Sequence, residues 1–343
     1  MHPNYEKYKL VSKQLHKIWN TYATLLEAIA LDEAYLDVTE TAKNLEGTRK
    51  IAQIIKNRTK EELGLTCSVG VAYSKAAAKT ASEEKKPNGY FEIPSTQDYI
   101  NLIINRNVRV LYTVGSKTAE KLSRAGIHTV RDVQCNQNKV VRLLGKQGHI
   151  ITGLALGIDE RKVITYRPQD AKSISREVTF QEDVENYEFL KDVLLLLCLC
   201  VKNRAKSVGL HGGGVTLKLT YSDMKSITRS KIISSYDYTF KIYQEAEQML
   251  TQVQKKSVRL IGVGIYNLST EGKRQLCFED IFEKKTLTRK DNLKNKLQHL
   301  QQRYHLDFSN HLTQIYQVDI LHKTVEYMRK HSGFNYVANS SKR

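Results

Sequence analysis

The chain has 343 residues, with 54 lysines and arginines against 36 aspartates and glutamates, a formal net charge of +18 and a pI near 9.5. This excess of positive charge is too large for an enzyme of neutral small molecules and favours a polyanionic partner such as nucleic acid. A hydrophobic fraction of 41% excludes global disorder, and the length indicates two or three domains.

Targeting signals and cysteine spacing indicate where the chain works. We find no long apolar segment, signal peptide or lipidation motif, so we expect a cytoplasmic protein without a membrane partner. The five cysteines are an odd number without a CxxC spacing, which indicates reduced structural thiols and argues against a zinc site.

The first predicted element is an amphipathic helix over residues 4–19. Its apolar and aromatic residues recur at helical spacing. They are Tyr8, Val11, Leu15, Ile18 and Tyr22.

Residues 31–38 join two adjacent carboxylates, Asp32 and Glu33, to a short apolar/polar alternation that predicts a half-buried strand. The side chains expected to face a core are those of Ala34, Leu36 and Val38. Tyr35 and Asp37 should face away. Because acidic residues are poor strand formers and Mg²⁺ prefers oxygen ligands, the pair is a candidate metal site, with a solvated turn as the alternative.

Residues 67–89 predict a strand over 67–72, an alanine-rich helix over 74–82 and a Pro-Asn-Gly turn that ends it. A basic helix start after a strand suits a phosphate, because free backbone N–H groups and lysine charge meet there. Lys79 is the candidate ligand of that phosphate, and an ordinary surface lysine is the alternative.

Residues 111–133 resemble a helix-hairpin-helix, a motif in which glycine lets backbone amides approach a DNA phosphate. The candidate DNA-binding residues here are Gly115, Lys117 and Thr118. Thr113 stands where the first hairpin glycine is expected, so we expect a weaker phosphate contact. The alternative is a plain helical turn.

Residues 172–265 predict a sheet with one buried face, from period-two strands at 172–180, 214–221 and 258–265. The apolar run 193–201 is too short to span a bilayer and predicts a buried helix on that sheet. The other, open face is a candidate DNA-binding surface or simply a solvated one. Its candidate residues are Ser173, Ser175, Arg176, Thr179, Lys218, Thr220, Arg229 and Arg259.

In this order the blocks resemble Y-family translesion DNA polymerases of the DinB, UmuC and polymerase IV type, over roughly residues 4–285. The resemblance implies a multidomain α/β and α+β fold. Its expected parts are a partial catalytic palm at 1–93, a helical thumb with the helix-hairpin-helix at 94–167, an α+β DNA-binding little finger at 172–283 and a basic helical tail at 284–343.

The resemblance also implies a DNA-directed DNA polymerase, a nucleotidyltransferase of DNA repair that copies damaged template in the bacterial cytoplasm at the nucleoid. Its partners would be primer-template DNA and deoxynucleoside triphosphates. Asp32 and Glu33 would be catalytic and hold two Mg²⁺ ions, and Lys79 would contact the triphosphate. In such enzymes the sheet of the little finger lies along the duplex and touches backbone phosphates.

Three features of the family have no counterpart in the sequence: a third metal-binding carboxylate, the steric-gate aromatic residue, and the Tyr and Arg pair of the fingers. We therefore expect a truncated or alternatively started reading frame of a full polymerase, and the sequence leaves open whether a separate upstream polypeptide completes it. An alternative is a non-catalytic duplex-binding remnant. An RNA-binding protein is weakly supported, because all four blocks are polymerase-like.

The C-terminal part carries two further signals. Residues Gln275–Phe282 resemble the peptide that docks such polymerases on the sliding clamp, although Glu279 and Asp280 split its apolar anchors; a last strand running into a loop is the alternative. Within 285–330, four residues at helical spacing predict an amphipathic helix that packs on the body or binds nucleic acid. They are Leu293, Leu297, Leu300 and Tyr304.

Overall fold

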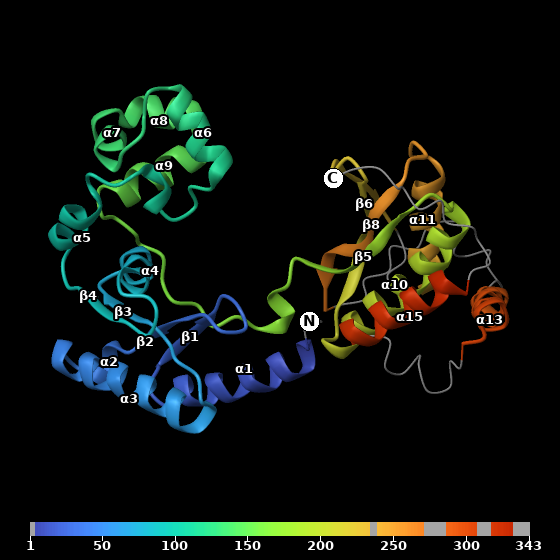
Figure 1. Ribbon diagram of the computed structural model, residues 1–343, viewed down its shortest axis with the longest axis horizontal. Coiled ribbons are helices and arrows are strands. Elements are labelled where there is room, and N and C mark those ends of the chain that lie inside the picture. Colours follow the sequence, from blue (N-terminus) through green and yellow to red (C-terminus); the bar gives the residue numbers. More distant parts are fainter. Residues whose placement is uncertain (1–3, 234–238, 271–285, 307–316, 332–343) are drawn as a thin grey trace. The chain divides into compact units, whose positions relative to one another are not determined.

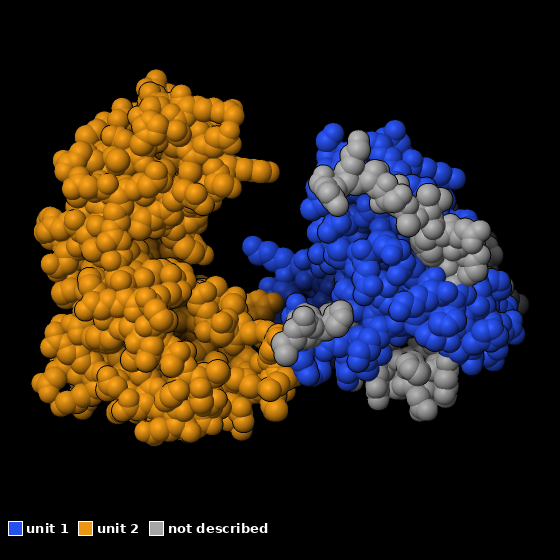
Figure 2. Space-filling view, viewed as in Figure 1, with its two compact units in different colours: residues 1–6, 167–343 blue, residues 7–166 orange. Residues whose placement is uncertain are grey.

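The structure, a computed structural model, describes residues 4–233, 239–270, 286–306 and 317–331. The chain forms two compact units (Figure 2). We call residues 7–166 the N-terminal unit, and residues 167–343 with the first six residues the C-terminal unit. No helix among the described residues is long and apolar enough to cross a membrane.

The N-terminal unit begins with a helix and a hairpin backed by a second long helix (Figure 1). The elements are α1 (Tyr5–Asn20), β1 (Leu25–Ala28), β2 (Ala34–Asp37), α2 (Thr39–Ala42) and α3 (Leu45–Leu63). The helix predicted at 4–19 is confirmed, and its Leu15 and Ile18 are buried with Ile55 of α3. β1 and β2 pair antiparallel, so residues 29–33 form the hairpin loop.

The strand predicted after Asp32 and Glu33 is confirmed as β2, but one orientation is wrong. Tyr35, expected to face away from a core, is 8% exposed. Ala34 and Leu36 pack, as expected, on the core that contains Leu15, Ile18 and Ile55. Tyr35 lies on the other face of the strand, where the Lys75 ammonium sits 5.0 Å from its ring centroid. Both faces of this short strand are therefore covered.

A parallel pair of strands with a connecting helix follows: β3 (Val69–Ala72), α4 (Lys75–Glu84) and β4 (Tyr90–Ile93). This confirms the predicted strand and helix, and the Ser74 side chain caps α4 by accepting from the Ala77 amide. A Cβ atom at Gly70 would lie 2.2 Å from the Ala78 carbonyl oxygen. Glycine at that position therefore lets α4 lie directly against β3.

Lys56 of α3 joins the turn after α4 to the start of β3. Its Nζ atom donates to the carbonyl oxygens of Cys67 (3.0 Å), Asn88 (2.7 Å) and Gly89 (3.1 Å), and to Oδ1 of Asn88 (2.8 Å). Hydrogen bonds that involve a charged group are stronger than those between neutral groups. One ammonium therefore fixes the Pro-Asn-Gly turn beside β3.

We expect Lys56→Met to lower the free energy of unfolding by about 2 kcal/mol, because three carbonyl groups lose a charged donor at once. Lys50→Met is the matched control, since Lys50 lies on the same helix and makes an exposed pair with Glu46. Urea unfolding measures both variants. Equal stability losses in the two variants would show that the cluster of carbonyl contacts contributes nothing specific.

The rest of the N-terminal unit is helical. Its elements are α5 (Thr96–Ile103), the 3-10 turn η1 (Val108–Val110), α6 (Ser116–Arg124), α7 (Val130–Cys135), α8 (Gln137–Leu144) and α9 (Lys146–Ala155). They share a core with α4 and β4, which includes Leu122, Val130 and Ile151. A reciprocal capping box between Thr129 and Asp132 starts α7.

Thr113, the residue found in place of the expected hairpin glycine, has a φ of +74°. That region is costly for a β-branched residue. The backbone thus keeps a left-handed conformation suited to glycine, although the side chain is a threonine.

The C-terminal unit is a four-stranded antiparallel sheet in the order β5-β8-β6-β7, covered on one face by helices (Figure 1). Its elements are the turn η2 (Pro168–Asp170), β5 (Ser173–Val184), α10 (Tyr187–Ser207), β6 (His211–Tyr221), β7 (Ser226–Ile232), α11 (Thr239–Thr251) and β8 (Val258–Ser269). The predicted apolar helix is confirmed within α10, which buries Cys198 and Cys200 as free thiols. Burial raises the pKa of the Cys200 thiol to about 11.

Two tail helices, α13 (Thr286–Tyr304) and α15 (Val318–Lys330), belong to the same core as the sheet. Among the described side chains of these helices, the buried apolar ones are those of Leu300, Tyr304, Leu321, Val325 and Met328. The Tyr304 hydroxyl donates to the Asp192 carboxylate of α10 at 2.6 Å, and Arg329 of α15 pairs with Glu182 of β5 at 2.5 Å. Of the two alternatives for the tail, the structure supports packing on the body.

Candidate active site and nucleic-acid interface

Asp32 and Glu33 lie in the hairpin loop between β1 and β2. The Glu33 carbonyl oxygen accepts from the amides of Ile29 (2.8 Å) and Ala30 (3.1 Å), which closes the loop. Asp32 is exposed, and Glu33 is partly buried. The loop therefore presents one free carboxylate beside one that is held against the body of the unit.

Lys79 of α4 reaches this loop. Its Nζ atom forms an ion pair with Glu33 and a second one with Glu83, at 2.9 Å to the latter. Burial lowers the pKa of Lys79, but the hydrogen bonds to Glu33 and Glu83 outweigh that effect and the net shift is upward. The ammonium stays charged at neutral pH. The structure thus brings two of the predicted site residues, Glu33 and Lys79, into contact, and Asp32 is the neighbour of Glu33 in the chain.

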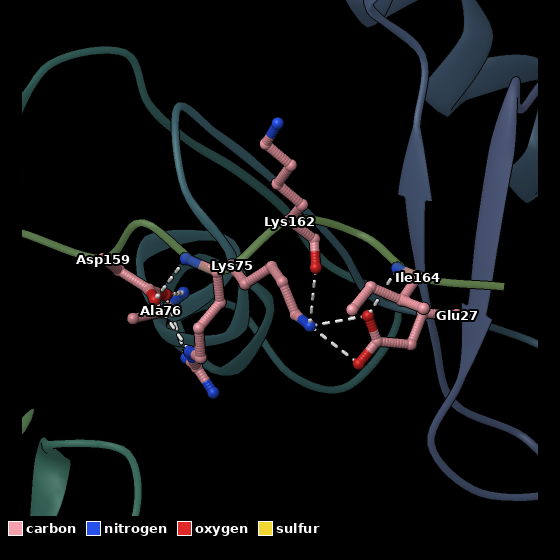
Figure 3. Close-up of polar contacts among 7 residues, drawn as sticks. Glu27, Lys75, Ala76, Asp159, Lys162 and Ile164 are labelled. Atoms are coloured by element: carbon pink, nitrogen blue, oxygen red, sulfur yellow. Dashed lines mark hydrogen bonds and ion pairs between the residues drawn. The ribbon is translucent and has the colours of Figure 1, made fainter. Parts of the chain in front are cut away.

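A second lysine of α4 anchors a distant segment (Figure 3). Lys75 donates to both carboxylate oxygens of Glu27 in β1, at 2.7 and 2.6 Å, and to the Lys162 carbonyl at 3.3 Å. Glu27 also accepts from the Ile164 amide at 2.9 Å. Burial by itself would raise the pKa of Glu27. The hydrogen bonds and the Lys75 charge outweigh that effect, so the net pKa lies below the usual range of a glutamate.

Asp159 extends this anchor to the start of α4. It accepts from the Ala76 amide at 2.8 Å (Figure 3). It also pairs with Arg161 at 2.7 Å. The Arg161 guanidinium lies 4.4 Å from the ring centroid of Tyr112. Residues 159–164, which follow the last helix of the unit, are thus held on α4 and β1.

The open face of the four-stranded sheet carries several serine and threonine hydroxyls. Ser173, Ser175 and Thr179 of β5 and Lys218 and Thr220 of β6 lie on this face, since their neighbours along each strand are buried. Three polar pairs run across it: Lys218–Glu177 at 2.8 Å, Thr216–Ser230 at 3.0 Å and Thr220–Ser226 at 2.8 Å. The one lysine among these residues is thus paired with a carboxylate.

Two arginines were assigned to the wrong face. Arg176 is the cross-strand partner of buried Val263 and lies beside Cys200 of α10, so it is on the helix-covered face. Arg229 stands opposite buried Leu217 and therefore points to the same side, at the exposed edge strand. Period-two alternation separates each of them from the serines and threonines that neighbour it.

Arg259 is exposed at the irregularity where β8 leaves register with β6, and its guanidinium lies 3.9 Å from the Asp183 carboxylate.

In the N-terminal unit, Gly115 is the N-cap of α6, and Lys117 and Thr118 occupy the first helical turn. Gly115 and Lys117 are exposed. Residues Gln275–Phe282, the predicted clamp-binding peptide, lie outside the described residues.

Comparison with known proteins identifies the family. Residues 1–83 match the impB/mucB/samB family, and residues 171–278 match the C-terminal domain of that family. A DNA polymerase IV from Clostridioides difficile (strain 630) is 36% identical over 274 residues, which cover 78% of this chain and 74% of the relative. The chain belongs to the Y-family of DNA polymerases.

Further relatives agree with this family. DNA polymerase IV of Listeria monocytogenes serotype 4b (strain F2365) is 35% identical over 272 residues, covering 78% of this chain and 76% of the relative. A solved Y-family polymerase chimera of Dbh and Dpo4 matches with a TM-score of 0.69 at 25% identity, over 77% of both chains. A post-insertion binary complex of Dbh DNA polymerase matches with a TM-score of 0.52, also at 25% identity and 77% of both chains. The Y-family resemblance predicted from the motifs is confirmed.

Sequence reasoning missed the polar anchor of this Y-family chain, which consists of Glu27, Lys75, Asp159 and Arg161. The only local signal is Lys75 itself, a lysine at the start of an alanine-rich helix, and it is 9% exposed. A nearly buried lysine needs a counter-charge. Its partner, however, comes from a strand 48 positions away, which the local pattern does not reveal.

We expect Lys75→Met to lower the free energy of unfolding by roughly 2 kcal/mol, because it leaves Glu27 without its ammonium partner. The Ile164 amide should also exchange faster with deuterium. Lys13→Met, at an exposed site on α1, is the control. Adding Glu27→Gln to Lys75→Met should recover part of the loss, and a purely additive double variant would contradict the coupling.

This pair also predicts a pH dependence. The folded-state pKa of Glu27 is lowered, so the stability that it contributes is complete above its unfolded pKa and is lost as the pH falls through the folded value. Lys75→Met should therefore lose less stability than the parent on acidification. Urea midpoints measured along a pH series compare the two proteins, and parallel curves would contradict this assignment.

Proposed function

We propose that this chain carries the metal and nucleotide site of a DNA-directed DNA polymerase that extends primers across damaged template. The observation that carries the proposal is the convergence of Glu33 and Lys79, beside exposed Asp32, in a member of the Y-family. We assign residues 1–93 to the palm, 94–167 to the thumb, 172–283 to the little finger and 284–343 to a helical tail. The alternative of a non-catalytic DNA-binding remnant is not favoured.

The reaction is a phosphoryl transfer. The 3′-hydroxyl of the primer attacks the α-phosphorus of a deoxynucleoside triphosphate, a new phosphodiester bond forms, and the hydroxyl proton passes to solvent. The bond to the β-phosphate breaks, and pyrophosphate leaves with the electron pair. Lys79 neutralises charge on the triphosphate, since its ammonium already lies at the edge of the carboxylate site. Its place on a helix fixes that charge before the substrate arrives.

The carboxylates suit Mg²⁺, which proteins commonly bind through one or two carboxylates together with substrate phosphates. Glu33 already attracts a cation, the Lys79 ammonium, and the Asp32 side chain is open to solvent. Within the described ranges, no group of three or more His, Cys, Asp or Glu side chains could hold a metal. We assign Asp32 and Glu33 as the ligands that this chain supplies to two Mg²⁺ ions. When bound, the metal activates the primer hydroxyl and stabilises the leaving phosphate.

Asp32→Asn should lower primer extension at least about 100-fold, because the variant keeps the shape of the side chain but not its charge. Glu40→Gln removes a carboxylate from exposed α2 and should leave extension unchanged. A gel assay with primed template, four deoxynucleotides and Mg²⁺ measures both, with duplex binding measured on the same DNA. Full extension by Asp32→Asn would refute the site, and binding without extension by the parent would restore the non-catalytic alternative.

For the DNA interface, we infer that the open sheet face binds the backbone of the duplex mainly through neutral hydrogen bonds. The face offers serine and threonine hydroxyls, and its lysine, Lys218, is paired with Glu177. Hydroxyl contacts to phosphates position the duplex but release no counterions. Lys117 and the other exposed cations would supply the salt-sensitive part of binding.

We therefore expect Ser175→Ala combined with Thr220→Val to weaken duplex binding roughly thirtyfold, since each of the two lost hydrogen bonds is worth about 1 kcal/mol, without changing the salt slope. Lys117→Ala should instead reduce the slope of log affinity against log salt by about 1. Fluorescence anisotropy over a salt series measures both quantities. A changed slope in the hydroxyl variant, or an unchanged one in Lys117→Ala, would contradict this division.

A further inference from the structure

The ion pairs around Lys79 form a chain of alternating charge along α4. Glu33 pairs with Lys79, Lys79 pairs with Glu83 at 2.9 Å, and Glu83 pairs with Lys86 at 2.7 Å. Lys79 and Glu83 are four residues apart on the helix, so they share one face. Glu33, by contrast, comes from the hairpin loop.

Both carboxylates beside Lys79 remain accessible. The exposed fractions of the side chains are 32% for Lys79, 39% for Glu33 and 47% for Glu83. A solvent-borne cation can therefore reach Glu33. An ammonium on the same carboxylate would then repel a divalent cation at short range, so the two cannot share Glu33 without loss.

We propose that Lys79 and the divalent metal compete for Glu33, and that Glu83 is the positioning residue that holds Lys79 once the metal has displaced it. This inference rests on the proposed function, in which Glu33 is a metal ligand. In the absence of metal, Lys79 neutralises the Glu33 carboxylate. When metal binds Glu33, Lys79 keeps its contact with Glu83 and turns its freed N–H donors to the triphosphate.

The exchange couples metal binding to nucleotide binding. An ammonium has three N–H donors, and in this structure two of its contacts are with carboxylates. Loss of the Glu33 contact frees a donor at the place where the nucleotide phosphates would lie. Glu83 limits the cost of that loss, because Lys79 is never left without a counter-charge.

The test uses the full chain and Mn²⁺ as the probe, with free Mn²⁺ measured by electron paramagnetic resonance in the absence of DNA and nucleotide. Lys79→Met should bind Mn²⁺ roughly tenfold more tightly, because the competing cation is gone. Glu83→Gln should bind it about threefold more weakly, because Lys79 then has Glu33 as its remaining carboxylate. The double variant should match Lys79→Met, since Glu83 acts only through Lys79.

Lys85→Met is the control for charge, because Lys85 ends the same helix and lies over Phe91, away from the two carboxylates. If the Mn²⁺ affinities of Lys79→Met and Lys85→Met differ by less than twofold, Lys79 does not compete with the metal for Glu33. A weakening by Glu83→Gln that persists in the double variant would overturn the positioning role. Exposed ion pairs add little stability, so all four variants should unfold at temperatures close to that of the parent.

Asp32→Asn separates this inference from the proposed function. If Asp32→Asn abolishes Mn²⁺ binding while Lys79→Met leaves it unchanged, the metal site stands and the exchange is wrong. If Mn²⁺ binding does not depend on Asp32, or is undetectable in every variant including Lys79→Met, the proposed metal site fails and the exchange fails with it.

Discussion

The close packing of α4 on β3 is the constraint on which the candidate site depends. Gly70 leaves no side chain between the strand and the helix, so α4 lies directly on the strand. Lys75 and Lys79 are one helical turn apart, about 6 Å along the axis. They meet Glu27 and Glu33, which stand on the neighbouring hairpin. A helix held further away would leave both pairs unmade.

The two lysines of α4 have different roles because their surroundings differ. Lys75 is 9% exposed, and its pair with Glu27 also holds the Ile164 amide, which makes it a fixed structural contact. Lys79 is more exposed and stands between two carboxylates. Lys75 is fixed in place because it is nearly buried and its partner Glu27 also binds the Ile164 amide. Lys79 can turn to a substrate because it is accessible and has a second acceptor in Glu83.

The net charge of +18 is not concentrated on the open sheet face. Alternation of side chains places Arg176 and Arg229 on the helix side, and it leaves hydroxyls and the paired Lys218 on the other. The helical tail adds cations as well, but its apolar residues pack into the core of the C-terminal unit. A face of hydroxyls suits a protein that holds the backbone of DNA without reading its sequence.

The sequence by itself determined the family, the order of the elements and the residues that converge at Glu33, because motifs and periodicity are local properties. Only the tertiary structure decided that Tyr35 is buried, that Arg176 faces the helices, and that Glu27 binds an amide 137 positions away. These outcomes depend on which element covers each face and on contacts between distant segments. A local pattern gives the alternation of a strand, but the packing of other elements decides what each side of it meets.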